Sequence, residues 1–276
     1  MIHPFRRVFR HTLPKLLGFA LSVSLVWCAA PKLPVTMIVE RSASANEKDF
    51  EAAEHFNYKE RDHTTTSTKT FQVTMIDGSP YRRLLAINGK PLSQADASEE
   101  WRKEENESAL RRTQTPAERS RRLAAYEKDR QTDHLMMAQL SKAFDFRLAG
   151  AGNLNKRKVW IFRAIPKLDY QPPNMASKVL PGMSGEMWID QQTYEWVKVT
   201  AEVIRPVSIE GFLARVEPGT RFEIEKMPVA AGVWQISHFS MYSNAKVLGL
   251  VNRASAEEDW YYDFKPVAEA KRIQQK

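Results

Sequence analysis

The sequence contains a single cysteine, Cys28, and it lies in the N-terminal segment. The chain from residue 46 onward therefore has neither a disulfide nor a reactive thiol. Trp27 stands directly before the cysteine, where a lipid-modified cysteine would need a small residue. No thiol chemistry is expected in that part of the chain, and a lipoprotein anchor at Cys28 is poorly supported.

Metal-binding and phosphate-binding motifs are also missing. None of the histidines beyond residue 45 has another histidine or a cysteine at the spacing of metal ligands. They are His55, His63, His134 and His238. Ser184, in the stretch GMSG, is one residue out of place for a nucleophile elbow. We therefore expect no enzyme, no catalytic residue, no metal and no cofactor.

The chain has only one long apolar stretch, LLGFALSVSLVWCAA at residues 16–30. It is shorter than the roughly 20 residues of a bilayer-spanning helix, and a basic segment without acidic residues precedes it. This pattern is typical of a secretory signal peptide. The small residues Ala43-Ser44-Ala45 predict cleavage before Asn46, so residues 1–45 are the expected signal peptide and the periplasm the expected location. An uncleaved N-terminal anchor is the alternative.

The basic charge of the chain belongs mainly to this leader. The whole sequence has 41 basic and 33 acidic residues, a formal net charge of +8. Six of the basic residues and one acidic residue lie in residues 1–45, which leaves 35 against 32, or +3, for the rest. A nucleic-acid-binding protein usually carries a strongly basic face. We therefore expect no nucleic-acid partner.

Alternation of apolar and polar residues predicts mostly β-structure. A short helix is expected at residues 46–60, and strands at 71–75 and 81–87 around the Asp77-Gly78 turn. From residue 143 onward nearly every segment reads as a strand. These strands are expected at residues 144–148, 158–165, 185–189, 195–204, 211–216, 220–225, 233–242, 245–251 and 259–264.

Residues 93–140 differ from the rest because they are charged, poor in β-branched residues and free of glycine. Two helices are expected there, at about 94–112 and 116–139. Ser93 is a candidate N-cap of the first, while Thr115, Pro116 and Glu118 form a capping box that starts the second. Their apolar content is thin, so each helix should lie on a surface or project from it.

Several strands have one consistently apolar face. Residues 195–204 place Val197, Val199, Ala201 and Val203 on one side. A wide apolar sheet face needs a covering layer or a ligand, because uncovered apolar surface costs about 25 cal/mol per Å² in water. Two arrangements remain open here: a sheet closed into a packed barrel, or an apolar surface that binds a ligand. Trp188 and Trp196 are either the rim of that surface or its outer shell.

The stretch GEMWIDQQTYEWVKVTAEV, followed by Phe222–Ile224 and by the strand AGVW at residues 231–234, resembles the outer-membrane lipoprotein-sorting family. That family includes the LolA and LolB lipoprotein carriers and the RseB sensor, and this chain is similar to an uncharacterised branch of it. The resemblance implies an α+β fold, mainly antiparallel β, in which an unclosed half β-barrel is covered by helices. The arginine that holds the lid in the carriers has no identifiable counterpart here.

Together, the patterns and the resemblance predict a half-barrel domain at residues 46–265, with an inserted charged helical hairpin at about 93–140, and a polar tail at 266–276. The expected function is non-covalent binding of a lipid or a lipoprotein acyl chain on the apolar barrel face. The alternative is an envelope sensor or protein-interaction module that contacts another envelope protein through the helices of residues 93–140. The predicted ligand-binding residues are Phe71, Val73, Trp160, Phe162, Trp188, Val197, Val199, Phe222, Ile224 and Trp234.

Overall fold

The structure is a computed structural model that describes residues 33–208, 214–247 and 251–267. The chain divides into two units, residues 1–30 and residues 31–276, and every described residue belongs to the second. The account below concerns that unit. The expected signal peptide lies largely outside the described residues.

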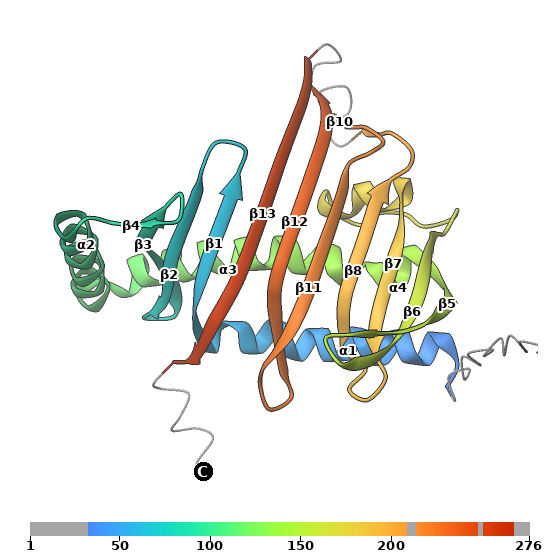
Figure 1. Cartoon of the computed structure of the whole chain (residues 1–276), viewed down its shortest axis with the longest axis horizontal. Coiled ribbons are helices and arrows are strands. Elements are labelled where there is room, and N and C mark those ends of the chain that lie inside the picture. Colours follow the sequence, from blue (N-terminus) through green and yellow to red (C-terminus); the bar gives the residue numbers. More distant parts are fainter. Residues whose placement is uncertain (1–32, 209–213, 248–250, 268–276) are drawn as a thin grey trace, which may run out of the picture. The chain divides into compact units, whose positions relative to one another are not determined.

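One antiparallel sheet contains all the strands of the described residues (Figure 1). Its order is β4-β3-β2-β1-β13-β12-β11-β8-β7-β6-β5, and β10 pairs with both β12 and β9. The two outer strands of this order do not pair with each other, so the sheet is not closed within the described residues. The strands are β1 Phe56–Thr64, β2 Thr68–Ile76, β3 Ser79–Ile87, β4 Lys90–Pro91, β5 Phe144–Leu154, β6 Arg157–Pro166, β7 Met183–Asp190, β8 Trp196–Val203, β9 Val207–Ser208, β10 Ala214–Val216, β11 Arg221–Ala230, β12 Val233–Val247 and β13 Val251–Pro266.

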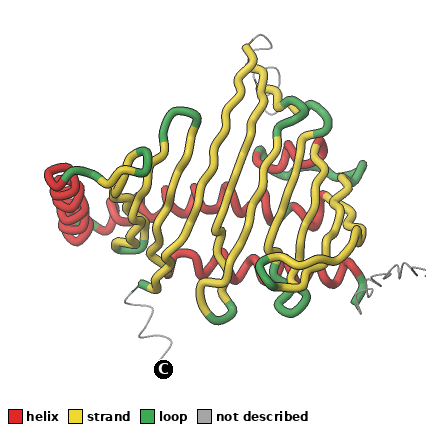
Figure 2. Tube along the Cα trace, viewed as in Figure 1, coloured by secondary structure: helices red, strands yellow, loops and turns green. Residues whose placement is uncertain are grey.

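Helices cover one side of this sheet (Figures 1 and 2). The long helices α1 (Val35–Ala52) and α3 (Pro116–Met137) cross behind the strands, and α2 (Gln94–Thr113) stands beside β3 at one edge. The short helices are α4 (Leu140–Ala143), η1 (Ala53–His55) and η2 (Ala176–Gly182). The predicted fold class is confirmed: a mainly antiparallel, unclosed sheet with covering helices and an inserted charged helical hairpin. No helix of the described residues is long and apolar enough to span a membrane.

The inserted hairpin follows its sequence signals closely. The Ser93 side chain accepts a hydrogen bond from the backbone N–H of Asp96 at the start of α2. At the start of α3 the capping box is complete, with Thr115 and Glu118 each bonding the other's backbone N–H. The predicted ranges 94–112 and 116–139 agree with α2 and α3 because these start signals are local.

The short helix predicted at residues 46–60 is wrong in extent. Helix α1 starts at Val35, eleven residues earlier, and ends at Ala52. Residues from Phe56 onward form strand β1, in which half-buried and exposed positions alternate toward its end. The strand predicted at 245–251 is not separate either, because residues 245–247 continue β12.

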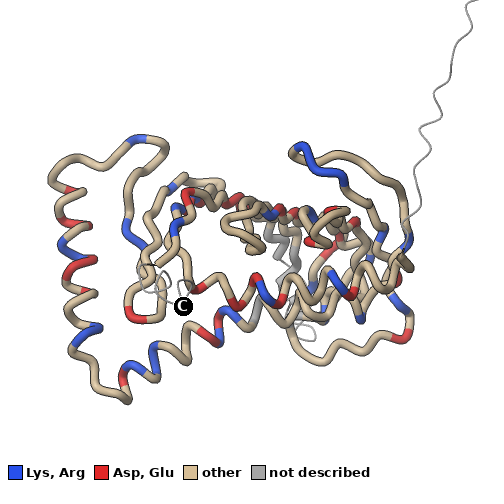
Figure 3. The backbone as a smooth tube through the Cα atoms, turned by 90° about the horizontal axis from the view of Figure 1, so that it is seen from below, with Lys and Arg blue, Asp and Glu red and all other residues tan. Residues whose placement is uncertain are grey.

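Helix α2 protects the open edge of β3. Arg111 donates hydrogen bonds of 2.8 Å from Nη1 to the carbonyls of Ile76 and Ser79. The Glu100 carboxylate accepts a bond of 3.2 Å from the backbone N–H of Leu84. An edge strand with free backbone groups can pair with other chains, so these side chains act against aggregation. Many of the charges on α2 therefore have an intramolecular role. Figure 3 shows charges of both signs along α2 and α3.

Candidate functional site

The main apolar core lies between the sheet and its helices. Phe162 and Ile189 are completely buried on the helix-facing side of the sheet, and Ile38 of α1 packs in the same cluster. This side also contains five of the predicted ligand-binding residues. They are Trp160, Phe162, Val199 and Ile224, which are buried, and Phe222, which is half-buried. The structure therefore brings half of the predicted set together.

The remaining predicted residues lie elsewhere. Val197 and Trp234 belong to a separate small cluster with Val159, and Trp188 packs against it. Val159 alternates with Trp160 along β6, so this cluster faces the side opposite the helices. Phe71 and Val73 lie on β2, beyond β1 and β13 in the strand order. Whether any of the ten residues binds a ligand stays a prediction.

The predicted face of residues 195–204 is wrong at Val197. The pairing of β7 with β8 shifts between Trp188 and Ile189, which oppose Lys198 and Trp196, so Val197 is the extra residue of a β-bulge. The bulge turns Trp196 toward the helices, where its Nε1 donates a 2.9 Å bond to Asn46, while Val197 faces the other way. Trp196 thus belongs to the core.

The apolar layer leaves little free space. A cleft of about 20 Å³ lies between the sheet and the segments of α4 and η2. Its lining includes Phe144, Leu180, Met183 and Phe222. Small-molecule sites usually offer roughly 300–1,000 Å³. In this conformation the cleft is too small for an acyl chain, and α4 or η2 would have to move to admit one there.

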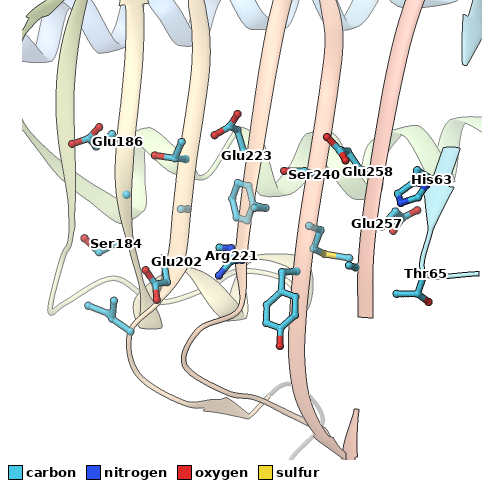
Figure 4. A pocket seen from close by; sticks show the side chains of 18 of the residues that line it. His63, Thr65, Ser184, Glu186, Glu202, Arg221, Glu223, Ser240, Glu257 and Glu258 are labelled. Carbon is cyan, nitrogen blue, oxygen red and sulfur yellow. The ribbon is translucent and has the colours of Figure 1, made fainter. Parts of the chain in front are cut away.

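A much larger hollow, of about 810 Å³, lies on the open side of the sheet, opposite the helices (Figure 4). It extends across strands from β6 to β1. One row of side chains consists of Arg163, Glu186, Thr200, Glu223, Ser240, Glu258 and His63, which are consecutive partners in the strand pairing. The next row consists of Ser184, Glu202, Arg221, Tyr242 and Ala256.

Two acidic residues that line this hollow, Glu223 and Glu258, each have a basic partner just outside the lining. Lys198 lies 2.7 Å from the carboxylate of Glu223 and 2.9 Å from that of Glu225. Burial alone would lower the pKa of Lys198, but the bonds to the two carboxylates outweigh it and raise the pKa. His238 and Glu258 form a further contact of 3.0 Å. Among the described residues, Glu202 and Arg163 form no ion pair and can contact a ligand.

The hollow shows polar recognition groups without a catalytic arrangement. Ser184 Oγ lies 3.4 Å from the carbonyl of Ala164, its only hydrogen bond within the described residues, so it has no base beside it. No group of three histidine, cysteine or carboxylate residues within the described ranges could hold a metal ion. The chemistry available here is hydrogen bonding and charge pairing.

A second hollow, of about 740 Å³, lies between α1 and the turns that join β7 to β8 and β11 to β12. The β7–β8 turn is the polar break DQQT. Asp190 accepts backbone bonds of 2.9 Å from Gln192 and Thr193. Burial would raise the pKa of Asp190, but these bonds, with Arg157, outweigh it and lower the pKa. The turn is therefore a rigid structural element.

Two groups of buried charges were not found from the sequence. Lys226 of β11 forms ion pairs with Asp49 of α1 and Glu195, and all three are buried. One signal was present, because Lys226 follows Phe222 and Ile224 at alternate positions on the apolar face. The second group is the carboxylate cluster Glu60, Asp62 and Asp259. Its members come from strands far apart in the sequence, so no local pattern indicates it.

Several solved structures resemble this chain in fold, at low identity and low TM-score. The chain is similar to the LolA superfamily protein NE2245 from Nitrosomonas europaea, with 9% identity, a TM-score of 0.33, and coverage of 87% of this chain and 97% of that one. A putative outer membrane lipoprotein-sorting protein domain from Vibrio parahaemolyticus has 9% identity and a TM-score of 0.30, over 83% of this chain and 93% of that one. The predicted resemblance is thereby confirmed.

The MucA/MucB complex of Pseudomonas aeruginosa contains a further similar chain, with 11% identity, a TM-score of 0.25, and coverage of 86% of this chain and 96% of that one. No family model and no curated protein sequence matches the chain. At these identities and TM-scores the functional argument rests on the residues of this protein alone.

Proposed function

We propose that this protein is an exported, non-catalytic binding module of the periplasm that holds a segment of a partner polypeptide in the hollow on the open side of the sheet. The observation that carries this proposal is the contrast between the two sides. The cleft on the apolar side has a volume of about 20 Å³, whereas the uncovered side has a polar hollow of about 810 Å³.

The lining of the hollow suits a polypeptide. Hydroxyl groups from Thr200 and Ser240 and charges of both signs from Glu202 and Arg221 alternate across the strands. Such groups can pair with backbone amides and with charged side chains of either sign, and complementary charges give an interface its specificity. No covalent step is involved.

Site-specific photo-crosslinking in cells tests this proposal. A photoreactive residue at Ser240 is expected to give one dominant crosslinked partner, because Ser240 lies in the middle of the hollow row. Adding Arg221→Glu is expected to lower the crosslink yield about tenfold, which corresponds to ~1.4 kcal/mol. The matched control is the same photoreactive residue at Glu99 on α2, which is exposed and outside the hollow.

The control position also tests the helices. If the partner crosslinks from Glu99 and not from Ser240, the charged helices carry recognition and the hollow does not. Exposed apolar residues on α2, Trp101 at 53% and Leu110 at 58% exposure, are the feature that would favour this outcome.

The second candidate function is a carrier of a lipid or a lipoprotein acyl chain on the helix-facing side. The feature in its favour is the apolar lining of the cleft, to which Phe146 and Phe222 contribute half-buried rings. Organic extraction of the protein purified from cells, followed by mass spectrometry, is expected to recover an acyl lipid if this function holds.

A matched pair of substitutions makes that test specific. Ala201→Leu fills the cleft and is expected to abolish lipid recovery, whereas Ser240→Leu places the same side chain in the hollow on the open side and should leave it unchanged. Protein that yields no lipid at all, under conditions that preserve its native fold, contradicts the carrier function.

A further inference from the structure

Three carboxylates meet on the helix-facing side where β1 and β13 pair. Asp62 of β1 lies directly opposite Asp259 of β13, and Glu60 lies two residues from Asp62 on the same side. Residues opposed across antiparallel strands have Cβ atoms only about 4.5–5.5 Å apart, and like charges there are destabilising. The cluster therefore lowers the stability of the folded state.

The charges of Asp62 and Asp259 lie in line with residues of the apolar core. Consecutive partners in one row across five strands are Val199, Ile224, Phe239, Asp259 and Asp62. The first three residues of this row belong to the apolar core or pack against it. A row that is apolar over three strands therefore ends in two acidic residues, although apolar residues would continue the core.

The cluster is only partly neutralised. Arg82 of β3 forms an ion pair of 2.9 Å with Glu60 and a second ion pair with Asp62. The guanidinium thus forms ion pairs with two of the three carboxylates. Other groups that face the cluster from neighbouring elements are Lys69, opposite Asp62 on β2 and exposed, Glu257, Tyr58, Tyr261 and, from α3, Tyr126.

Two carboxylate oxygens in this cluster have no partner. Asp259 is only 7% exposed, and its Oδ1 is buried without a hydrogen bond among the described residues. Asp62 Oδ1 is in the same condition. A buried polar atom without a partner costs about 1–3 kcal/mol, and native proteins retain few of them. Such atoms are expected where the protein recognises something.

The unpaired Oδ1 atoms of Asp62 and Asp259 can each accept a hydrogen bond. We propose that Asp62 and Asp259 form a binding site for an organic cation, a guanidinium or a primary ammonium group, that enters beside Arg82. The side chain of Arg82 is 46% exposed and that of Asp62 is 25% exposed, so the cluster reaches solvent on this side while Asp259 lies innermost. A guanidinium offers five N–H donors in a planar fork, which matches two facing carboxylates.

The ionisation of the cluster agrees with this geometry. Burial raises the pKa of Asp259 to about 6, and the charges of Asp62 and Glu257 raise it further, against Arg82 and Tyr261. Burial likewise raises the pKa of Glu60 to about 7, although Arg82 opposes the shift. A bound cation would favour the charged forms. Cation binding should therefore release protons and weaken as the pH falls from about 8 to about 5.5.

Isothermal titration of the purified protein with agmatine, which has one guanidinium and one ammonium group, tests the site. Saturable binding is expected at about pH 8, with affinity at least about tenfold lower at about pH 5.5. Asp259→Asn should abolish the binding. The matched control Asp145→Asn, which neutralises an exposed carboxylate of β5 outside the hollow and outside the cluster, should leave it unchanged. No saturable binding at pH 8, or equal binding by Asp259→Asn, overturns the proposal.

The melting temperature of Asp259→Asn shows whether a loss of agmatine binding is due to misfolding. Asp259 has a folded-state pKa above its unfolded value, so its contribution to stability is present at low pH and is lost as the pH rises through about 6. Asp259→Asn removes the like charge and is expected to raise Tm at about pH 8 by a few degrees. A folded, stabilised variant that no longer binds agmatine separates recognition from folding. An unchanged Tm at pH 8 contradicts the assigned cost.

Titration with a second ligand shows whether the cation belongs to a partner polypeptide or to a free amine. A short peptide with one arginine and blocked termini represents a partner polypeptide, whereas agmatine represents a free amine. Tighter binding of the peptide assigns a protein partner, and tighter binding of agmatine assigns a free polyamine. This site lies on the side of the sheet opposite the hollow, so the crosslinking result at Ser240 and the titration result stand or fall separately.

Discussion

Lys226→Met is expected to destabilise the protein by about 3–5 kcal/mol. Only 2% of the Lys226 side chain is exposed, and its Nζ lies between Asp49, with 4%, and Glu195, with 7%. Removing the lysine leaves two carboxylates in a site closed to water. Breaking a buried ion pair by removing one partner is costly, because the remaining charge is neither solvated nor compensated.

The same group joins three parts of the fold. Asp49 belongs to α1, Glu195 precedes β8 and Lys226 belongs to β11. Asp49 also accepts a 2.8 Å bond from the backbone N–H of Trp234 on β12. The ammonium group of Lys226 lies 4.8 Å from the ring centroid of Trp196, a cation–π contact. The substitution should therefore loosen the attachment of α1 to the sheet.

The destabilisation caused by Lys226→Met should depend on pH in a definite direction. Burial raises the pKa of Glu195 to about 7 even though Lys226 opposes the shift. Without Lys226 the Glu195 carboxyl group should bind a proton still more readily in the folded state than in the unfolded chain. The destabilisation is then relieved as the pH falls toward about 4.5 and is largest above about pH 7.

Urea unfolding at several pH values measures this effect. The matched control is Lys198→Met, which also removes a lysine between two carboxylates but at a site with 18% exposure on the open side. A loss of no more than about 1 kcal/mol is expected there, since water and salt screen the remaining charges. Equal losses for the two variants, or a Lys226→Met loss that acid does not relieve, would show that burial does not set the cost.

The sequence signals succeeded where the physical cause is local. The starts of α2 and α3 depend on side chains within three residues of each N-cap, and both could be predicted. The alternation of Trp160 and Phe162 with Val159 and Ile161 along β6 is likewise a local pattern, and the two pairs lie in different clusters. In each case the interacting residues are neighbours in the chain.

The failures have non-local causes. Val197 faces the unexpected side because β7 pairs with β8 through a bulge, which no pattern within residues 195–204 reveals. The hollow uses alternate residues from strands as distant as β1 and β13, so its parts meet only once the strand order is known. Only half of the predicted ligand-binding residues lie together on the helix-facing side of the sheet. A strand with one apolar face does not by itself indicate a ligand site, because helices that pack on that face require the same pattern.

The sequence signals also missed the first part of helix α1, residues 35–45. It lacks a side-chain N-cap, and its buried residues Ile38, Val39, Ser42 and Asp49 are mixed in polarity. An amphipathic pattern is weak when a buried position is a charged residue whose partner, Lys226, lies far away in the sequence. The burial of Asp49 makes sense only with that partner present.

Removing residues 31–45 is expected to destabilise the protein by about 3–6 kcal/mol, because burial of one Val or Ile side chain contributes roughly 1.5–3 kcal/mol. A chain that starts at Asn46 lacks Ile38, which is 0% exposed, and Val39, which is 6% exposed. Cleavage before Asn46 stays a prediction, and α1, which runs through this position, makes its consequence measurable.

Two chains, one starting at Pro31 and one at Asn46, should be compared by urea unfolding. Ile38→Ala in the longer chain is the matched variant and should cost about 2–5 kcal/mol on its own, since it leaves a cavity in the core. Mass spectrometry of the exported protein then gives the mature N-terminus and shows which of the two chains is the exported form. If export yields a chain that begins at Asn46 and is as stable as the longer one, the contacts of Ile38 and Val39 contribute nothing to the native fold.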